Sequence, residues 1–271
     1  MIPVGDSPIA RRTPWMLYII LLANIAVFVW TLSLSPEVPR SRAQAAAEFR
    51  EQTLQYCYGL ESPPSPRDRF FCQWGLQPQE FVDNATDQLK FPVASRTEIW
   101  LTLFTSMFMH AGWLHIIGNM LFLWVFGDNV EDRLGHLGFL VFYLASGVVA
   151  ALTQIAVDPE TTVPVVGASG AVAGVLGAYL VFFPRAMVNV VFPVFIFIFI
   201  PIPVPAVVMI GLWFLQNLFA GILSITSEAA VGGGVAFFAH IGGFLFGALT
   251  VLFFLRNAGR SRPAPRWRYY R

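Results

Sequence analysis

The chain has 271 residues, of which 56% are hydrophobic and 12% are charged, and its formal net charge at pH 7 is +1. An ordinary soluble domain carries about 25% charged residues. Only eight charged residues lie between Ile99 and Leu255, so this stretch cannot supply the polar surface of a water-soluble domain. Composition therefore excludes a soluble enzyme, a nucleic-acid-binding protein and a disordered protein, and it predicts an all-α polytopic membrane protein.

Six uncharged segments are long enough to be membrane spans. A short segment of residues 1–13 precedes the first span, and a polar stretch of residues 35–98 follows it. Prolines between residues 193 and 205 disfavour a helix there, so we expect residues 186–204 to be a connection at the membrane interface. Together the spans form a predicted membrane domain of residues 14–256, and a basic tail follows at 257–271. The spans are Pro14–Leu34, a helix within Leu103–Gly127, Gly138–Val157, Gly167–Phe183, Pro205–Ile225 and Val235–Leu255.

The distribution of arginine predicts the orientation of the spans. Cytoplasmic loops of membrane proteins carry an excess of lysine and arginine. With the N-terminus inside, the loops at 158–166 and 226–234 face outward, and neither contains lysine or arginine. We therefore expect both termini to be cytoplasmic and the long loop 35–98 to lie outside. The arginines that this orientation places inside are Arg11, Arg12, Arg133, Arg185 and the six of the last 16 residues.

Three of the predicted spans carry polar side chains, which are costly in a membrane and usually functional. His115 lies in the second span, Ser169 in the fourth and His240 in the sixth. Each lies 16 residues before a charged residue at the inner end of its span, and Asn119 lies one turn deeper than His115. Sixteen residues of helix span about 24 Å. The three side chains should therefore share one depth, in the outer third of the bilayer. The charged residues are Glu131, Arg185 and Arg256.

The chemistry of these side chains favours acyl transfer. A serine hydroxyl becomes a useful nucleophile when a base takes its proton, and histidine suits that role near neutral pH. We expect Ser169 to be the nucleophile and His240 the base. His115 and Asn119 share one helix face, and both can donate hydrogen bonds to an oxyanion. His110 should point elsewhere or lie in a loop.

Taken together, the motifs resemble those of the rhomboid intramembrane serine proteases. The match covers about residues 97–256 and the first span, and its order and spacing are specific to that family. The matching segments are His110-Ala-Gly-Trp-Leu-His115-Ile-Ile-Gly-Asn119, Glu131-Asp-Arg133-Leu-Gly135, Gly167-Ala-Ser-Gly-Ala-Val-Ala-Gly174 and Ala239-His-Ile-Gly-Gly243 with Gly247.

This resemblance implies a six-helix rhomboid-like bundle with a water-filled cavity open to the outer face. It implies a Ser169–His240 dyad without a third carboxylate, and an oxyanion hole made by the Ser169 amide, His115 and Asn119. The segment with Glu131 and Arg133 would be a structural turn. Some family members stack an aromatic residue on the catalytic histidine four positions after the nucleophile, where this chain has Ala173. Phenylalanines near His240 are then expected to hold it: Phe237, Phe238 or Phe244.

The resemblance also implies the partners and the place of action. Substrates would be transmembrane segments of other proteins, cut near the outer face in a cell membrane, and no cofactor, metal or nucleic acid is expected. The bilayer itself is the other partner, and the basic tail either binds its anionic lipids or enforces topology. Cys57 and Cys72 either form a disulfide in an oxidising compartment or stay free.

Two functions of other classes compete with proteolysis. A non-catalytic rhomboid-like protein that binds client helices would lack the serine or the histidine, and this chain keeps both. A transporter or channel would place paired ionisable residues near the midplane. The predicted spans contain no Asp, Glu, Lys or Arg. A zinc protease of the H-E-x-x-H type is excluded because the motif does not occur.

Overall fold

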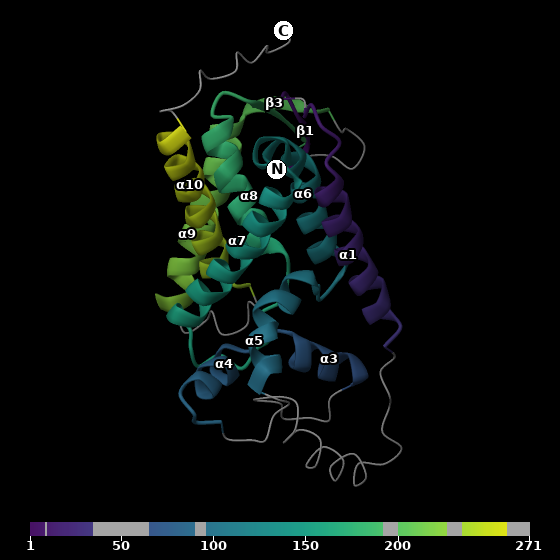
Figure 1. The fold of residues 1–271 in the computed structure, drawn as a ribbon, viewed down its shortest axis with the longest axis vertical. Helices are drawn as coiled ribbons and strands as arrows, with labels where there is room; N and C mark the ends of the chain where they lie inside the picture. The colour runs from purple at the N-terminus through teal and green to yellow at the C-terminus, as the bar shows by residue number, and fades with distance from the viewer. Residues whose placement is uncertain (9, 35–64, 90–95, 192–199, 227–234, 259–271) are drawn as a thin grey trace.

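The computed structural model describes residues 1–8, 10–34, 65–89, 96–191, 200–226 and 235–258 as a helical bundle with a small sheet at one end (Figure 1). The helices are α1 Trp15–Leu32, α3 Pro66–Trp74, α4 Pro78–Ala85, α5 Arg96–Thr105, the 3₁₀ turn η1 Ser106–Phe108, α6 Trp113–Leu134, α7 His136–Val157, α8 Ser169–Phe182, α9 Ala206–Thr226 and α10 Phe237–Ala258. The strands are β1 Ile2–Asp6, β2 Met187–Val191 and β3 Ile202–Pro205.

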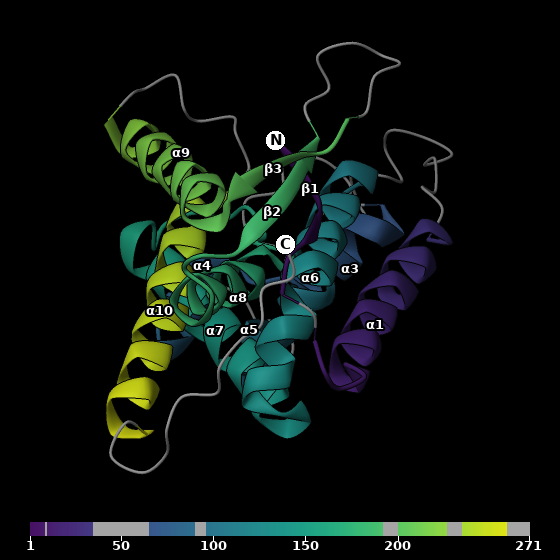
Figure 2. The same ribbon diagram turned by 90° about the horizontal axis from the view of Figure 1, so that it is seen from above.

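Helix α8 lies at the centre of the bundle, between α6, α7 and α10, whereas α1 and α9 lie at opposite edges (Figure 2). Glycines let α8 and α10 approach closely. A Cβ added to Gly243 would lie 2.1 Å from the Gly170 carbonyl oxygen, and one added to Gly247 would lie 2.0 Å from that of Gly174. The backbones thus meet directly, which is typical of helix pairs in membranes. This contact sets the separation of the two helices.

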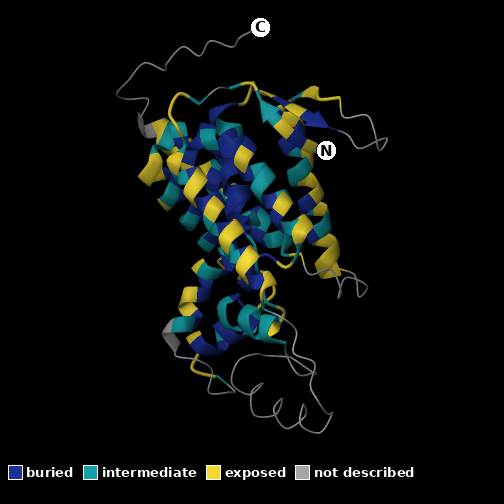
Figure 3. Ribbon diagram, turned by 90° about the vertical axis from the view of Figure 1, so that its right-hand side faces the viewer, coloured by how far each residue is buried: buried dark blue, intermediate teal, exposed yellow. Residues whose placement is uncertain are grey.

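Four helices are long and apolar enough to cross a membrane: α1, α7, α9 and α10. Many large apolar side chains of these helices are exposed, and Figure 3 marks the exposed residues along the bundle in yellow. A fifth span exists if the bent pair of α5 with η1 and α6 counts as one. Helix α8 has 14 residues, which is about 21 Å of helix and shorter than the hydrocarbon core. Its neighbours surround it, so it does not have to meet lipid along its whole length.

The segment Leu103–Gly127, in which the second span is predicted, contains the end of α5, the turn η1 and the start of α6. The chain bends by 79° between Phe108 and Trp113, where Gly112 is extended and begins α6. Helix α5 instead packs with α3, α4 and α7 at one end of the molecule. A second apolar cluster holds it there, so burial outside the main bundle outweighs helix continuity. The cluster contains Leu76, Phe81, Ile99, Leu103, Ala151 and Ile155.

The polar stretch 35–98 contains ordered helices that the sequence reading did not anticipate. Helix α3 begins at a capping box in which the Ser65 side chain accepts from the Asp68 amide and the Asp68 carboxylate accepts from the Ser65 amide. The buried Cys72 on α3 is disulfide-bonded. Cys57 lies outside the described residues. The short α3–α4 unit therefore has its own local stabilisation.

The expected all-α fold missed a three-stranded sheet at the end of the bundle opposite α3 and α4 (Figure 1). Strand β2 pairs with β1 on one side and with β3 on the other, both antiparallel. Strands β2 and β3 come from the apolar connection predicted at 186–204, and β1 comes from residues 1–13. The described N-terminal residues are thus part of the fold. The residue pattern of β2 and β3 resembles that of an interfacial loop because each strand is short.

Asp6 joins the sheet to the bundle and predicts a pH-dependent contact. Its carboxylate accepts from Tyr179 Oη (2.5 Å) and Asn129 Nδ2 (3.1 Å), and burial raises the pKa of Asp6 from 3.8 to about 7. Because the folded state favours the protonated acid, its stability contribution is complete below about pH 4 and is lost as pH rises through about 7. Amide exchange of β1, corrected for intrinsic rates, should accelerate by about tenfold or more between pH 5 and pH 8. In Asp6→Asn that difference should disappear, and a pH-independent β1 in the wild type would contradict the assignment.

Glu131 lies in the last turn of α6, inside a helix rather than in the separate turn that the resemblance implied, and it contacts the first helix. Its buried carboxylate accepts from the Met16 amide (3.0 Å) and the Leu17 amide (2.7 Å). These amides belong to the first turn of α1, which has no side-chain cap of its own. Glu131 therefore ties the end of α6 to the start of α1.

Replacing Glu131 with alanine should lower the free energy of unfolding by about 3 kcal/mol, because it leaves one buried and one partly buried amide without this acceptor and removes a favourable helix-end charge. Denaturation of the purified protein, followed by circular dichroism, measures this. The exposed Asp158 offers a control, whose alanine variant should change stability by less than about 0.5 kcal/mol. Equal stability of the Glu131 and Asp158 variants would show that the cap is unimportant.

Candidate active site

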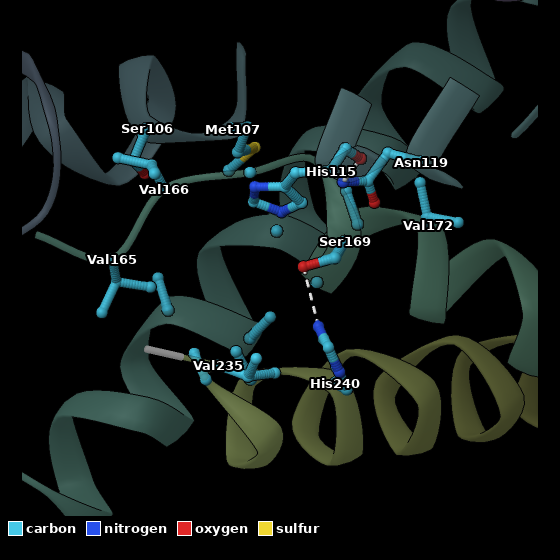
Figure 4. Close-up of a pocket in the computed structure, with 18 of the residues that line it drawn as sticks. Ser106, Met107, His115, Asn119, Val165, Val166, Ser169, Val172, Val235 and His240 are labelled. Atoms are coloured by element: carbon cyan, nitrogen blue, oxygen red, sulfur yellow. Dashed lines mark hydrogen bonds between the residues drawn. The ribbon is translucent and has the colours of Figure 1, made fainter. Parts of the chain in front are cut away.

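The four residues singled out from the sequence meet at one end of three helices. His115 is the third residue of α6, Ser169 the first residue of α8 and His240 the fourth residue of α10. All three line a cavity of about 510 Å³, and Asn119 lines it one turn further along α6. In Figure 4, His115 and Asn119 lie on one side of Ser169 and His240 on the other. His115, Ser169 and His240 lie at the same sequence distance from a charged residue, and in the structure each lies within the first four residues of its helix.

Ser169 and His240 are in hydrogen-bond contact. The Oγ atom of Ser169 lies 2.8 Å from Nε2 of His240, across the α8–α10 interface (Figure 4). The glycine pairs described above hold these two helices at this separation. A hydroxyl that donates to an imidazole nitrogen at this distance can transfer its proton during nucleophilic attack.

Asn217 on α9 holds the other nitrogen of His240. Its Oδ1 lies 2.6 Å from His240 Nδ1, and its Nδ2 donates to the Trp213 carbonyl oxygen at 2.8 Å. A carbonyl oxygen only accepts, so the NH₂ group must face Trp213 and the amide oxygen must face His240. Nδ1 therefore carries the proton, and Nε2 is left free to accept from Ser169. The network selects the tautomer that a general base requires.

The sequence reading missed Asn217 and Trp213. The expected supports for His240 were phenylalanines of its own helix, whereas the ring beside it is Trp213, with centroids 5.8 Å apart. Phe244 lies against the Trp213 ring, with centroids 6.4 Å apart. A strongly polar residue in the fifth predicted span was the available signal. Asn217 is 7% exposed, so only an internal partner explains its position in α9.

His115 and Asn119 provide hydrogen-bond donors on the side of Ser169 that faces away from His240 (Figure 4). Asn119 uses one N–H of its amide to bond the His115 carbonyl oxygen (3.0 Å), which leaves the second N–H for a ligand. The ring of His115 lies against Gly167, where a Cβ would be 2.6 Å from His115 Nε2. Gly167 also has a φ of +127°, which side chains rarely adopt. The glycine before the nucleophile thus makes room for the histidine.

His110 lies in the loop before α6, which is one of the two places the sequence allowed. It is fully buried, and its ring meets that of His115 edge-on with centroids 5.0 Å apart. Its Nε2 also faces the Ala168 amide at 3.5 Å. His110 therefore supports both His115 and the backbone next to Ser169, although it does not line the cavity.

The described part of the chain has no group of three His, Cys, Asp or Glu side chains that could hold a metal ion. The cavity instead combines the hydroxyl of Ser169, one oriented imidazole and at least two side-chain donors. The start of α8 adds backbone amides, because the first N–H groups of a helix have no intrahelical partner. This set can carry out nucleophilic acyl transfer with stabilisation of an oxyanion.

The chain was compared with known proteins. The Rhomboid domain family matches residues 97–257, which is more than half of the chain. Over 81 residues the chain is 40% identical to "Rhomboid protease GluP" of Bacillus subtilis, covering 30% of this chain and 15% of that protein. "Putative rhomboid protease YdcA" of the same organism is 36% identical over 81 residues, covering 30% and 40%. "RHOMBOID-like protein 1" of Arabidopsis thaliana is 27% identical over 270 residues, covering 93% and 59%. Each of these matches covers less than two thirds of the relative's length.

Proposed function

Because the chain belongs to the rhomboid family, we propose that it is an intramembrane serine endopeptidase that cleaves transmembrane segments of other membrane proteins. Two of its relatives carry the name rhomboid protease. The observation that carries the proposal is the 2.8 Å contact between Ser169 Oγ and His240 Nε2. Asn217 on the far nitrogen of that histidine adds support, because it favours the tautomer that accepts a proton.

The reaction begins when Ser169 attacks the carbonyl carbon of the scissile peptide bond. Its oxygen forms a bond to that carbon as its proton moves to His240 Nε2. The C–N bond of the tetrahedral intermediate then breaks, and His240 gives the proton to the leaving amine. Water attacks the resulting ester with the same histidine as base, which releases the carboxylate and restores Ser169. No additional reactant is required.

The tetrahedral intermediate places negative charge on the former carbonyl oxygen. The Ser169 amide, His115 and Asn119 are the donors proposed to bind it. Loss of one such donor raises a barrier by about 2.7–4 kcal/mol in a well-studied serine protease. His115 and Asn119 lie across Ser169 from His240, so a carbonyl between them would expose its carbon to the serine (Figure 4).

We place the cavity at the extracytoplasmic face of a cell membrane, with both termini cytoplasmic and six spans that include α8 and the bent pair. The arginine distribution supports this orientation. Helical substrates protect their backbone through internal hydrogen bonds, so segments that unwind easily near the outer face are the expected substrates. The competing proposal, a non-catalytic protein that binds client helices, uses the same cavity and requires no activated serine.

A fluorophosphonate probe separates these two proposals. The purified protein should form a covalent adduct on Ser169, identified by peptide mass spectrometry, and His240→Ala should lose most of it. Ser146, a buried serine of α7 that bonds the Phe142 carbonyl oxygen, should remain unlabelled. A folded wild-type protein that resists the probe, or undiminished labelling in His240→Ala, would favour client binding.

A further inference from the structure

The segment that joins α3 to α4 is attached to the wall of the cavity, although it precedes residues 97–257, the region that matches the Rhomboid domain. The Leu76 amide donates to the Val165 carbonyl oxygen (3.2 Å), and the Val165 amide donates to the Leu76 carbonyl oxygen (2.7 Å). The two residues form an antiparallel β-bridge. Val165 lines the cavity and lies four residues before Ser169. The segment that joins α3 to α4 therefore holds in place the loop that leads to Ser169.

Further hydrogen bonds extend this attachment along the loop. Gln77 Nε2 donates to the Thr162 carbonyl oxygen (2.6 Å), and the Gln79 amide donates to that of Thr161 (3.1 Å). Packing at Gly75 is equally close, since an added Cβ would lie 3.0 Å from a Val166 side-chain carbon. The loop and the segment that joins α3 to α4 thus form one continuous wall.

The Leu76 side chain forms part of the cavity wall. Leu76 lines the cavity but has no exposed surface, so it is packed directly behind the space that a ligand could enter. Leu76 shares an apolar cluster with Ala151 and Val165, which also line the cavity. Most of the lining is apolar, and its hydroxyl, amide and imidazole groups come from Ser106, His115, Asn119, Ser169 and His240. An aliphatic or aromatic side chain of a bound peptide fits such a surface.

We infer that Leu76 is a specificity-determining residue, which sets the depth of an apolar subsite for one side chain of the substrate. Substrate choice then depends on the α3–α4 unit as well as on the matched family domain. The inference rests on the proposed function for the reaction, but a peptide can bind in the subsite whether or not it is cut. Binding and cleavage can therefore be tested separately.

Variants of different size at position 76 should change selectivity in opposite directions. Leu76→Ala deepens the subsite, so the preference for a large over a small substrate side chain should rise by about tenfold. Leu76→Phe fills the subsite and should lower the same preference by about tenfold. Leu76→Val should give a smaller change in the direction of alanine, and it keeps most of the packing if the alanine variant folds poorly.

The test measures affinities of short fluorescein-labelled peptides for Ser169→Ala protein with each residue at position 76. The peptides come from the outer boundary of a single-pass substrate, and each position in turn carries Ala, Leu or Trp. At one peptide position, Leu76→Ala and Leu76→Phe should shift the preference for large over small side chains in opposite directions. Phe81→Ala is the matched control, because Phe81 packs in the same cluster and does not line the cavity. That variant should leave the preference unchanged.

Unchanged preferences in all position-76 variants would overturn the inference, and so would a failure of every peptide to bind folded protein. An equal shift in Phe81→Ala would also overturn it, because the effect would then come from general loosening of the α3–α4 unit. Failure of the proposed function looks different: the binding preferences shift as described, while the protein with Ser169 intact cuts no substrate.

Discussion

Ser169→Ala is expected to abolish cleavage of a single-pass substrate, with a loss in kcat of about 10⁴- to 10⁶-fold. The alanine removes the atom that forms the covalent intermediate and that contacts His240 Nε2. His240→Ala should lose about as much, because the serine then has no base at Nε2. Initial rates with detergent-solubilised protein, measured by fluorescence of a labelled substrate, give both values.

The double variant Ser169→Ala/His240→Ala should be hardly slower than either single variant. Residues that act as one unit lose their joint effect when either is removed. Ser146→Ala serves as the matched control, since Ser146 is a buried serine on the neighbouring α7 and does not line the cavity. Its activity should stay within about threefold of wild type. If the loss in the double variant equalled the product of the two single losses, a shared mechanism would be contradicted.

The second large effect is expected at Asn217. Asn217→Leu keeps a similar volume but removes the acceptor for His240 Nδ1–H, which leaves a buried donor unpaired. Such a loss is worth about 1–3 kcal/mol, so kcat/KM should fall by about 10- to 100-fold. Asn217→Asp restores an acceptor and should recover part of the activity. It should also move the acidic limb of the pH–rate profile to higher pH, because a carboxylate favours the protonated imidazole.

Asn24→Leu is the control for the Asn217 variants. Asn24 is a fully buried asparagine of α1 that donates to the carbonyl oxygen four residues earlier, as Asn217 does, and it does not line the cavity. Its replacement should affect stability without moving the pH profile. If Asn217→Leu and Asn217→Asp kept the wild-type profile and rate, the oriented-tautomer account would be wrong.

The sequence predicted the composition of the site better than its architecture. His115, Ser169 and His240 carry a signal that needs no three-dimensional information, because strongly polar side chains recur at one distance from charged helix ends. Asn217 has no such anchor, since no charged residue follows it within the span. Its role depends on α9 packing beside α10, which is a tertiary contact. The same limitation explains why Trp213 was overlooked in favour of phenylalanines on the helix of His240.

Irregular parts of the chain were the hardest to predict. The bend between α5 and α6 occurs at a short segment that contains His110 and Gly112, and the packing of Leu103 with Leu76 and Phe81 holds α5 away from the axis of α6. Short strands such as β2 have the same apolar composition as an interfacial loop. Pairing across more than 180 residues, as between β1 and β2, leaves no local pattern. Boundaries of α1, α7, α9 and α10 agreed within a few residues because lipid-facing helices must be continuous and apolar.

The most direct test of the central claim is to identify the products of a defined reaction by mass spectrometry. Wild-type protein and Ser169→Ala are each reconstituted with a single-pass substrate in liposomes, and the intact fragments are weighed. We expect the wild type to produce two fragments that meet at one peptide bond near the end of the transmembrane segment, and Ser169→Ala to produce neither. The same fragments from Ser169→Ala, or no cleavage by a folded wild-type protein, would contradict the account.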